Sequence, residues 1–239
     1  CSALTFTGVS FANNADVNAK NADQTKSKTS IEHIQILGRD NKLSTESGSA
    51  TLIDELELEK FDYDDIHRVL ANVPGVNIRQ EDGYGLRPNI GFRGVTPERS
   101  KKINILEDGI LIGPAPYSAP AAYYFPSVNR MTSVEVFKGP SAIKYGPNTV
   151  AGTLNMTTRS VPDESEGQVE FSAGSNGYQK LHGFYGNSFA INHSDQFGFV
   201  VEALKTQADG FKDIDNAENS LYDQESGFDK TELMLKANY

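Results

Sequence analysis

The sequence predicts an α+β domain with a mixed sheet and short helices, followed by the first antiparallel strands of a transmembrane β-barrel. Residues 31–160 combine short β-rich runs with one helical pattern, which is typical of an α+β domain. Residues 161–239 form long segments in which apolar and polar residues alternate, as in the strands of membrane barrels. No apolar run reaches the roughly 18 residues that a membrane-spanning helix requires.

The composition argues against several classes of function. The chain has 239 residues, of which 38% are hydrophobic, so it can bury the core of one or two domains. Its net charge of -10 disfavours a nucleic-acid-binding surface, which needs clustered Lys and Arg. The sequence has no HExxH, Walker-type or GxSxG motif, and its four histidines lack metal-ligand spacing. We therefore expect no enzyme activity, no intrinsic cofactor or metal, and no nucleic-acid partner.

Residues 1–15 are interpreted as the remnant of an export signal. Residues 2–12 are uncharged and end in a small-x-small pattern at 10–12, which is typical of a signal cleavage site. The alternative makes Cys1 the acylated first residue of a lipoprotein. Residues 16–30 follow as a polar tether, rich in Lys and Asn and without apolar periodicity.

The α+β region contains one clear helical pattern and several short strands. Residues 62–73 have apolar side chains at helical spacing and acidic side chains at the start, and Pro74-Gly75 ends this helix. Val76–Arg79 is the next β-rich run. Residues 103–112 predict a hairpin that turns at Asp108-Gly109.

The second region reads as a series of half-buried strands. Residues 168–173 alternate apolar with polar side chains, and further strands are expected at about 178–190 and 197–205, joined by a tight turn. The connection over 206–229 is much longer, and alternating short and long connections are typical of outer-membrane barrels. About four strands cannot close a barrel, because an open edge in lipid leaves backbone groups unpaired. We therefore expect residues 161–239 to begin a barrel whose other strands are missing, which makes the sequence an N-terminal fragment. The alternative is a soluble β-sandwich, whose strands also alternate.

Four stretches resemble those of one family. Residues 131–159 hold the β-rich run Val134–Phe137, a Gly-Pro stop, a Tyr-Gly-Pro turn and a second β-rich run. Before them stand Gly91-Phe-Arg-Gly94, Leu106-Glu-Asp-Gly-Ile110 and Ala115-Pro-Tyr-Ser-Ala-Pro120. In this order they resemble the plug domain of TonB-dependent outer-membrane receptors. The Ala-Pro-Tyr segment is similar to the ferric citrate receptor branch of that family.

The resemblance implies a receptor in the outer membrane of a Gram-negative bacterium that imports an iron(III) chelate, either a siderophore or a ferric citrate-like compound. The plug would face the periplasm, iron would be cargo, and lipopolysaccharide would surround the outer loops. TonB, with its inner-membrane ExbB/ExbD complex, would supply the work. The alternative function is a non-transporting surface binding protein or adhesin on a β scaffold.

Residues 79–102 carry a local excess of positive charge in an acidic protein. Arginines placed among glycines suit a loop that presents guanidinium groups to a carboxylate-rich ligand. By the resemblance, Arg93 would contact the chelate from the plug apex, with the Gly83–Gly85 loop beside it. That loop is shorter than in the ferric citrate branch, with Tyr84 in place of a small hydroxyl residue. The expected ligand contacts are Arg93, Tyr84, Arg87 and Tyr117. Alternatively, several of the arginines pair with acidic groups of the barrel wall.

Residues 29–38 form an extended, β-branched segment that ends in glycine and resembles the TonB box. Such a segment pairs through its backbone with a strand of its partner. The expected contacts with TonB are therefore Ile31, Glu32, His33, Ile34, Gln35 and Ile36. On pattern alone, the same segment is equally well interpreted as the first strand of the plug.

Overall fold

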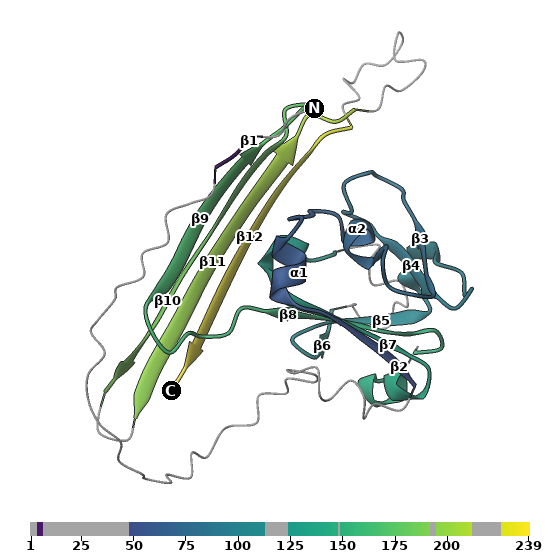
Figure 1. Cartoon of the computed structure of the whole chain (residues 1–239), viewed down its shortest axis with the longest axis horizontal. Coiled ribbons are helices and arrows are strands. Elements are labelled where there is room, and N and C mark those ends of the chain that lie inside the picture. The colour runs from purple at the N-terminus through teal and green to yellow at the C-terminus, as the bar shows by residue number, and fades with distance from the viewer. Residues whose placement is uncertain (1–3, 7–47, 113–123, 148, 192–194, 212–225) are drawn as a thin grey trace. The chain divides into compact units, whose positions relative to one another are not determined.

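The computed structural model describes residues 4–6, 48–112, 124–147, 149–191, 195–211 and 226–239 (Figure 1). The chain divides into two compact units, one of Asp23–Arg159 and one that joins Cys1–Ala22 to Ser160–Tyr239. The tether, the TonB box-like segment and Tyr117 lie outside the described residues, as does most of the export-signal segment.

The first unit is built on a five-stranded mixed sheet. Its strand order is β2-β7-β8-β5-β6, and neighbouring strands are antiparallel except for β5 and β8, which are parallel. The strands are β2 (Ser49–Ile53), β5 (Ile103–Glu107), β6 (Ile110–Leu111), β7 (Met131–Lys138) and β8 (Gly152–Thr158). β5 and β6 form the hairpin that the sequence predicts, and β7 contains the predicted run Val134–Phe137. The mixed-sheet α+β prediction is thereby confirmed.

One face of this sheet carries the hydrophobic core. Val134 and Val136 of β7 and Leu154 and Met156 of β8 are fully buried, at the every-second-residue spacing that a strand requires. The helix α2 (Ile66–Leu70) contributes both of its terminal side chains to the same core. The helix and the sheet therefore form two packed layers around one core.

The helix α2 is shorter than the predicted span of 62–73. Asp65 caps it, because the Asp65 carboxylate accepts the His67 N–H at 2.8 Å while the Asp65 backbone stays extended. Asp62 has a φ of 43°, which is incompatible with an α-helix. The helix therefore begins at Ile66, and the earlier acidic residues precede it.

The sequence analysis missed a second short helix, α1 (Glu55–Glu59), which Asp54 caps by accepting the Glu57 N–H at 2.9 Å. The described residues of this unit also form the 3-10 helices η2 (Glu98–Ser100), η4 (Val128–Arg130) and η5 (Pro140–Tyr145). Within the described ranges, no helix is both long and apolar enough to cross a membrane.

β3 (Val76–Arg79) and β4 (Asn89–Phe92) form a separate two-stranded antiparallel sheet. Val76 pairs with Phe92 and Arg79 pairs with Asn89, so residues 80–88 connect the strands at one end of the hairpin. Gly75 and Arg93 lie at the opposite end. The sequence predicts β3 but not β4, because all four β4 residues are buried and show no alternation.

The second unit is a five-stranded antiparallel sheet in the order β1-β9-β10-β11-β12. Its long strands pair in sequence order: β9 (Glu166–Ala173), β10 (Gln179–Ala190), β11 (Gln196–Ala208) and β12 (Phe228–Asn238). β10 and β11 correspond to the strands predicted at about 178–190 and 197–205. β1 (Leu4–Phe6) falls in the segment interpreted as an export signal, and it pairs with β9, Leu4 opposite Ala173.

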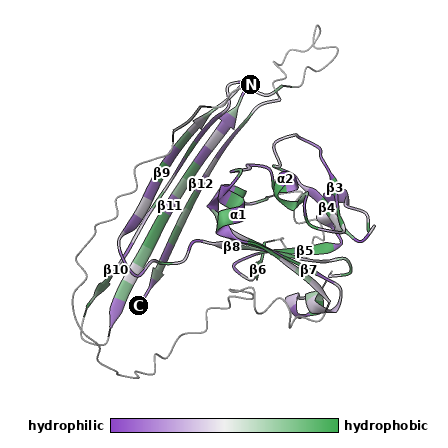
Figure 2. Cartoon of the chain, viewed as in Figure 1, coloured by the Kyte–Doolittle hydropathy of each residue, from purple (hydrophilic) through white to green (hydrophobic). Residues whose placement is uncertain are grey.

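The two faces of this second sheet differ in polarity, and Figure 2 shows the alternation along its strands. The register places a set of exposed apolar side chains on one face: Val169, Phe171, Leu181, Tyr185, Val201, Leu233 and Leu235. The opposite face carries three ion pairs: Glu170–Lys180 at 3.3 Å, His182–Glu202 at 2.8 Å and Lys230–Glu232 at 2.8 Å. An exposed apolar face with charge pairs behind it is typical of barrel strands whose outer side contacts lipid. In a soluble sandwich, the solvent-exposed face is polar instead.

Candidate functional site

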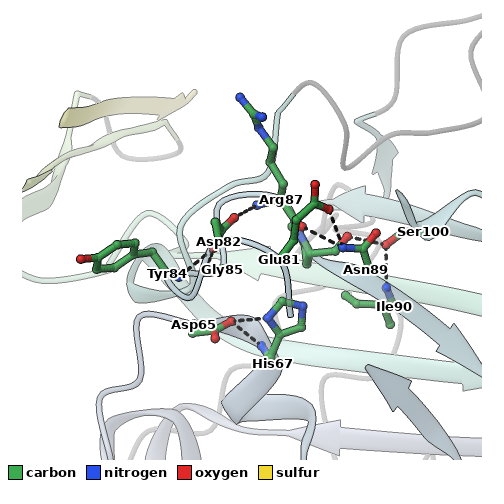
Figure 3. Close-up of polar contacts among 11 residues, drawn as sticks. Asp65, His67, Glu81, Asp82, Tyr84, Gly85, Arg87, Asn89, Ile90 and Ser100 are labelled. Carbon is green, nitrogen blue, oxygen red and sulfur yellow. Dashed lines mark hydrogen bonds and ion pairs between the residues drawn. The ribbon is translucent and has the colours of Figure 1, made fainter. Parts of the chain in front are cut away.

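The connection between β3 and β4 contains a loop, residues 82–87, that is organised around one carboxylate (Figure 3). Asp82 Oδ1 accepts the backbone N–H groups of Tyr84 and Gly85, both at 2.7 Å. Asp82 Oδ2 accepts the N–H of Arg87 at 2.8 Å. Aspartate favours such turns because its carboxylate replaces the backbone acceptor that the turn lacks. The shape of the loop is therefore set by a residue inside it.

A buried polar cluster holds the start of β4, where the loop ends. The Asn89 amide donates to Glu81 Oε2 at 3.0 Å, and Asn89 Oδ1 accepts the Arg99 N–H at 2.7 Å. The Ser100 hydroxyl accepts the Ile90 N–H at 3.0 Å and donates to the Pro88 carbonyl at 2.9 Å. These bonds tie the loop to the segment that follows β4.

The inner side of the loop rests on the N-terminus of α2. Gly85 is buried with a φ of 75°, and a Cβ at this position would lie 2.5 Å from Asp65 Oδ1. The same oxygen accepts the His67 N–H. His67 Nδ1 also lies 2.8 Å from it, but without hydrogen-bond geometry. The loop backbone thus approaches the helix cap more closely than any side chain would allow.

The outer side of the loop presents Tyr84 and Arg87. Figure 3 shows both side chains extending away from Asp82 in different directions. Arg87 is exposed and Tyr84 is half-buried. A guanidinium group matches the oxygens of a carboxylate, and a phenol supplies a ring face and a hydroxyl.

Arg93 lies elsewhere in this unit, beside a second cation. The Arg93 backbone N–H donates to the Gly75 carbonyl at 2.8 Å. Its exposed guanidinium group lies against Gly139, with Nη1 3.0 Å from the position that a Cβ would occupy there. Lys138, which precedes Gly139, is buried, and its ammonium group donates to the Pro74 carbonyl at 2.6 Å. Burial lowers the pKa of the Lys138 ammonium, and the positive charge of Arg93 lowers it further.

The structure separates the predicted ligand contacts into two places. Tyr84 and Arg87 share the loop at one end of the β3–β4 hairpin, and Arg93 lies at the other end. Four paired residues place these ends about 10 Å apart along the strands. This corrects the expectation that the Gly83–Gly85 loop lies beside Arg93.

Sequence analysis did not identify Asp82 or Lys138 as site residues. The Asp82-Gly83 dipeptide is a turn signal that could have pointed to Asp82. We find no sequence signal for Lys138, because its place beside Arg93 arises only from the tertiary fold. Among the residues that the structure describes, no three His, Cys, Asp or Glu side chains are grouped to hold a metal ion.

Comparison with known proteins gives one family match. Residues 42–153 match the model of the TonB-dependent Receptor Plug Domain. A curated relative, Vitamin B12 transporter BtuB of Photobacterium profundum, is 28% identical over 162 residues, covering 67% of this chain and 25% of the relative. Vitamin B12 transporter BtuB of Vibrio vulnificus is 27% identical over 179 residues, covering 75% of this chain and 27% of the relative. The chain therefore spans about a quarter of the length of these curated relatives.

The fold is shared with several solved structures, among them a transporter and a receptor. The unliganded ferric citrate transporter FecA aligns with a TM-score of 0.50 and 20% identity, over 72% of this chain and 33% of that chain. The siderophore receptor PirA from Acinetobacter baumannii aligns with a TM-score of 0.52 and 23% identity, over 75% of this chain and 27% of that chain.

Proposed function

We propose that the chain belongs to the family of TonB-dependent receptors, whose plug-domain model matches residues 42–153, and that the complete protein imports an iron(III) chelate across the outer membrane with work supplied through TonB. The observation that supports this most directly is a plug-type domain followed in the same chain by an antiparallel sheet with an exposed apolar face. Receptors of this family transport ligands and are not enzymes. The complete protein would lie in the outer membrane of a Gram-negative bacterium, with its plug toward the periplasm and lipopolysaccharide around its outer loops.

The ligand would bind to the loop at residues 82–87, because this loop is rigidly held and presents a guanidinium group and a phenol. An iron(III) complex of a hydroxycarboxylate is anionic, so the exposed Arg87 suits it. Arg93 would supply a second, separate cationic contact, and Tyr117 a further aromatic one. Iron would be carried as part of the chelate and not as a resident cofactor.

A corrinoid is the second candidate substrate, because the two curated relatives named above are vitamin B12 transporters. A corrinoid is large and carries amides in place of an array of carboxylates, so it would depend less on arginine. Equilibrium binding of ferric citrate and of cyanocobalamin to the purified complete receptor separates the two candidates.

An adhesin, by contrast, has no use for a plug domain.

Arginine substitutions test the chelate proposal. In the complete receptor, Arg87→Ala is expected to weaken ferric citrate binding by about 1.5 to 3 kcal/mol, as a lost charge-assisted contact does. Arg93→Ala is expected to have an effect of the same order, and Arg93→Lys to recover part of it, because lysine keeps the charge but not the bidentate geometry. Isothermal titration measures both.

Arg68→Ala is the matched control, because Arg68 is an exposed arginine on α2 that belongs neither to the loop at residues 82–87 nor to the Arg93 contact. Protease resistance of the plug must be measured beside affinity. If Arg87→Ala and Arg93→Ala leave a stable plug and an unchanged affinity, the ligand is not recognised by these arginines.

The apolar face of the second sheet gives a further prediction. Phe171→Arg in the complete receptor should destabilise membrane insertion by about 2 to 4 kcal/mol if this face meets the lipid centre. Gln168→Arg on the opposite face of the same strand should cost little. Folding into lipid vesicles, followed by gel mobility with and without heating, measures both. Equal effects of the two changes would remove the membrane assignment of this face.

A further inference from the structure

Asp82 contributes no exposed recognition group, yet it makes three of the hydrogen bonds that shape the ligand loop. We propose that Asp82 is a positioning residue, which holds Tyr84 and Arg87 in their binding orientation through the backbone. This inference rests on the proposed function and goes beyond it, because it assigns ligand affinity to a residue that does not touch the ligand.

The hydrogen bonds use both oxygens of one carboxylate. Oδ1 serves Tyr84 and Gly85 at 2.7 Å each, and Oδ2 serves Arg87 at 2.8 Å. The two residues that present recognition groups are therefore both bonded to Asp82 through their own N–H groups. A change at Asp82 moves the backbone from which the phenol and the guanidinium project.

The Asp65–Gly85 contact holds the loop on a second side. Gly85 lies so close to Asp65 Oδ1 that even a methyl group would collide with it. Asp65 is itself fixed as the cap of α2, through the His67 N–H. The loop is thus held in two ways. Asp82 accepts hydrogen bonds from backbone amides of the loop, and Gly85 packs against the cap of α2.

A loop clamped in this way has little conformational freedom to lose on binding. The ordering of Tyr84 and Arg87 then takes place during folding, so it does not oppose ligand association. Without the Asp82 carboxylate, the loop keeps Tyr84 and Arg87 but samples more conformations. Ligand binding must then restrict these conformations, and the lost entropy weakens the affinity. The expected result is weaker binding with every ligand-contacting side chain still present.

Asp82→Asn in the complete receptor is the direct test. Asparagine retains one acceptor oxygen and places a donor where the second oxygen was, so one side of the clamp is lost. We expect roughly ten-fold weaker binding of the probe ferric citrate. Hydrogen exchange at the amides of Tyr84, Gly85 and Arg87 should rise, with exchange in the β7–β8 core unchanged.

Asp54→Asn is the matched control. Asp54 also accepts a backbone N–H, at the start of α1, but it lies outside the ligand loop. It should change neither ferric citrate affinity nor exchange in the loop.

A mutant cycle against the combined Tyr84→Ala and Arg87→Ala background separates positioning from general stability. If Asp82 acts by placing Tyr84 and Arg87, then Asp82→Asn should weaken binding about ten-fold in the native background and much less where both side chains are already removed. An equal loss in both backgrounds would overturn the inference. So would unchanged loop exchange in Asp82→Asn, a result that needs no ligand.

The cycle also separates this inference from the proposed function. If Arg87→Ala and Tyr84→Ala weaken ferric citrate binding but Asp82→Asn does not, the loop is the ligand site and Asp82 does not position it. If neither side-chain removal changes affinity, the proposed ligand site itself is wrong, and the inference falls with it.

Discussion

Replacing Ile34 with proline is expected to abolish uptake by the complete receptor while leaving ligand binding intact. Proline removes the backbone N–H that a paired strand donates and fixes φ at about -65°. A segment that engages TonB by strand addition cannot pair through such a residue. Uptake of the proposed iron(III) chelate by cells and its equilibrium binding to the purified receptor are the two measurements.

Ile34→Val is the matched control, because valine keeps both the N–H and the β-branched side chain. It should support uptake at nearly the native rate. Normal uptake by an Ile34→Pro receptor at native surface levels would assign residues 29–38 to the plug as its first strand. Loss of binding as well as uptake would indicate that the substitution damages the plug.

Elements with a clear local signal were predictable from the sequence. The hairpin at 103–112 has a turn dipeptide between two β-rich runs, and β10 and β11 have long alternating patterns. The alternation of apolar and polar residues that begins after residue 161 can be recognised from the order of residues alone. These features need no tertiary contact, so the sequence contains them in full.

Elements whose form depends on packing were missed or misplaced. In β4 every residue is buried, and Gly91 lies so close to the Val95 carbonyl that a Cβ would be 2.4 Å from it. Such a strand shows no alternation and reads as a loop. The start of α2 was placed too early because several acidic residues precede it, and only the structure identifies Asp65 as the cap.

The candidate site was predictable in composition but not in arrangement. A local excess of arginine among glycines pointed to Arg87 and Arg93, yet the β3–β4 register places them at opposite ends of a hairpin. The approach of Arg93 to Gly139, beside the like-charged Lys138, joins segments that are far apart in the sequence. Residue types indicated which chemistry is present, and strand pairing decided which groups share a location.

The largest stability effect is expected from Gly152→Ala at the start of β8. A Cβ there would lie 2.2 Å from the Phe137 carbonyl oxygen and 2.6 Å from Phe92 Cδ2, both in the packed interior. The backbone of β7 and a buried ring cannot both move aside without strain, so a loss of about 3 kcal/mol is expected in the plug.

Gly94→Ala separates the clash from the backbone conformation. Gly94 also has a positive φ, 79°, but no heavy atom within 4 Å of its Cβ position. It should cost only about 1 kcal/mol, from the left-handed backbone alone. Native-state hydrogen exchange of β7 and β8 amides in the complete receptor measures both. If Gly152→Ala and Gly94→Ala lower the stability equally, the residues around Gly152, among them Phe137 and Phe92, move aside without cost. The core of the plug would then be more easily deformed than its packing indicates.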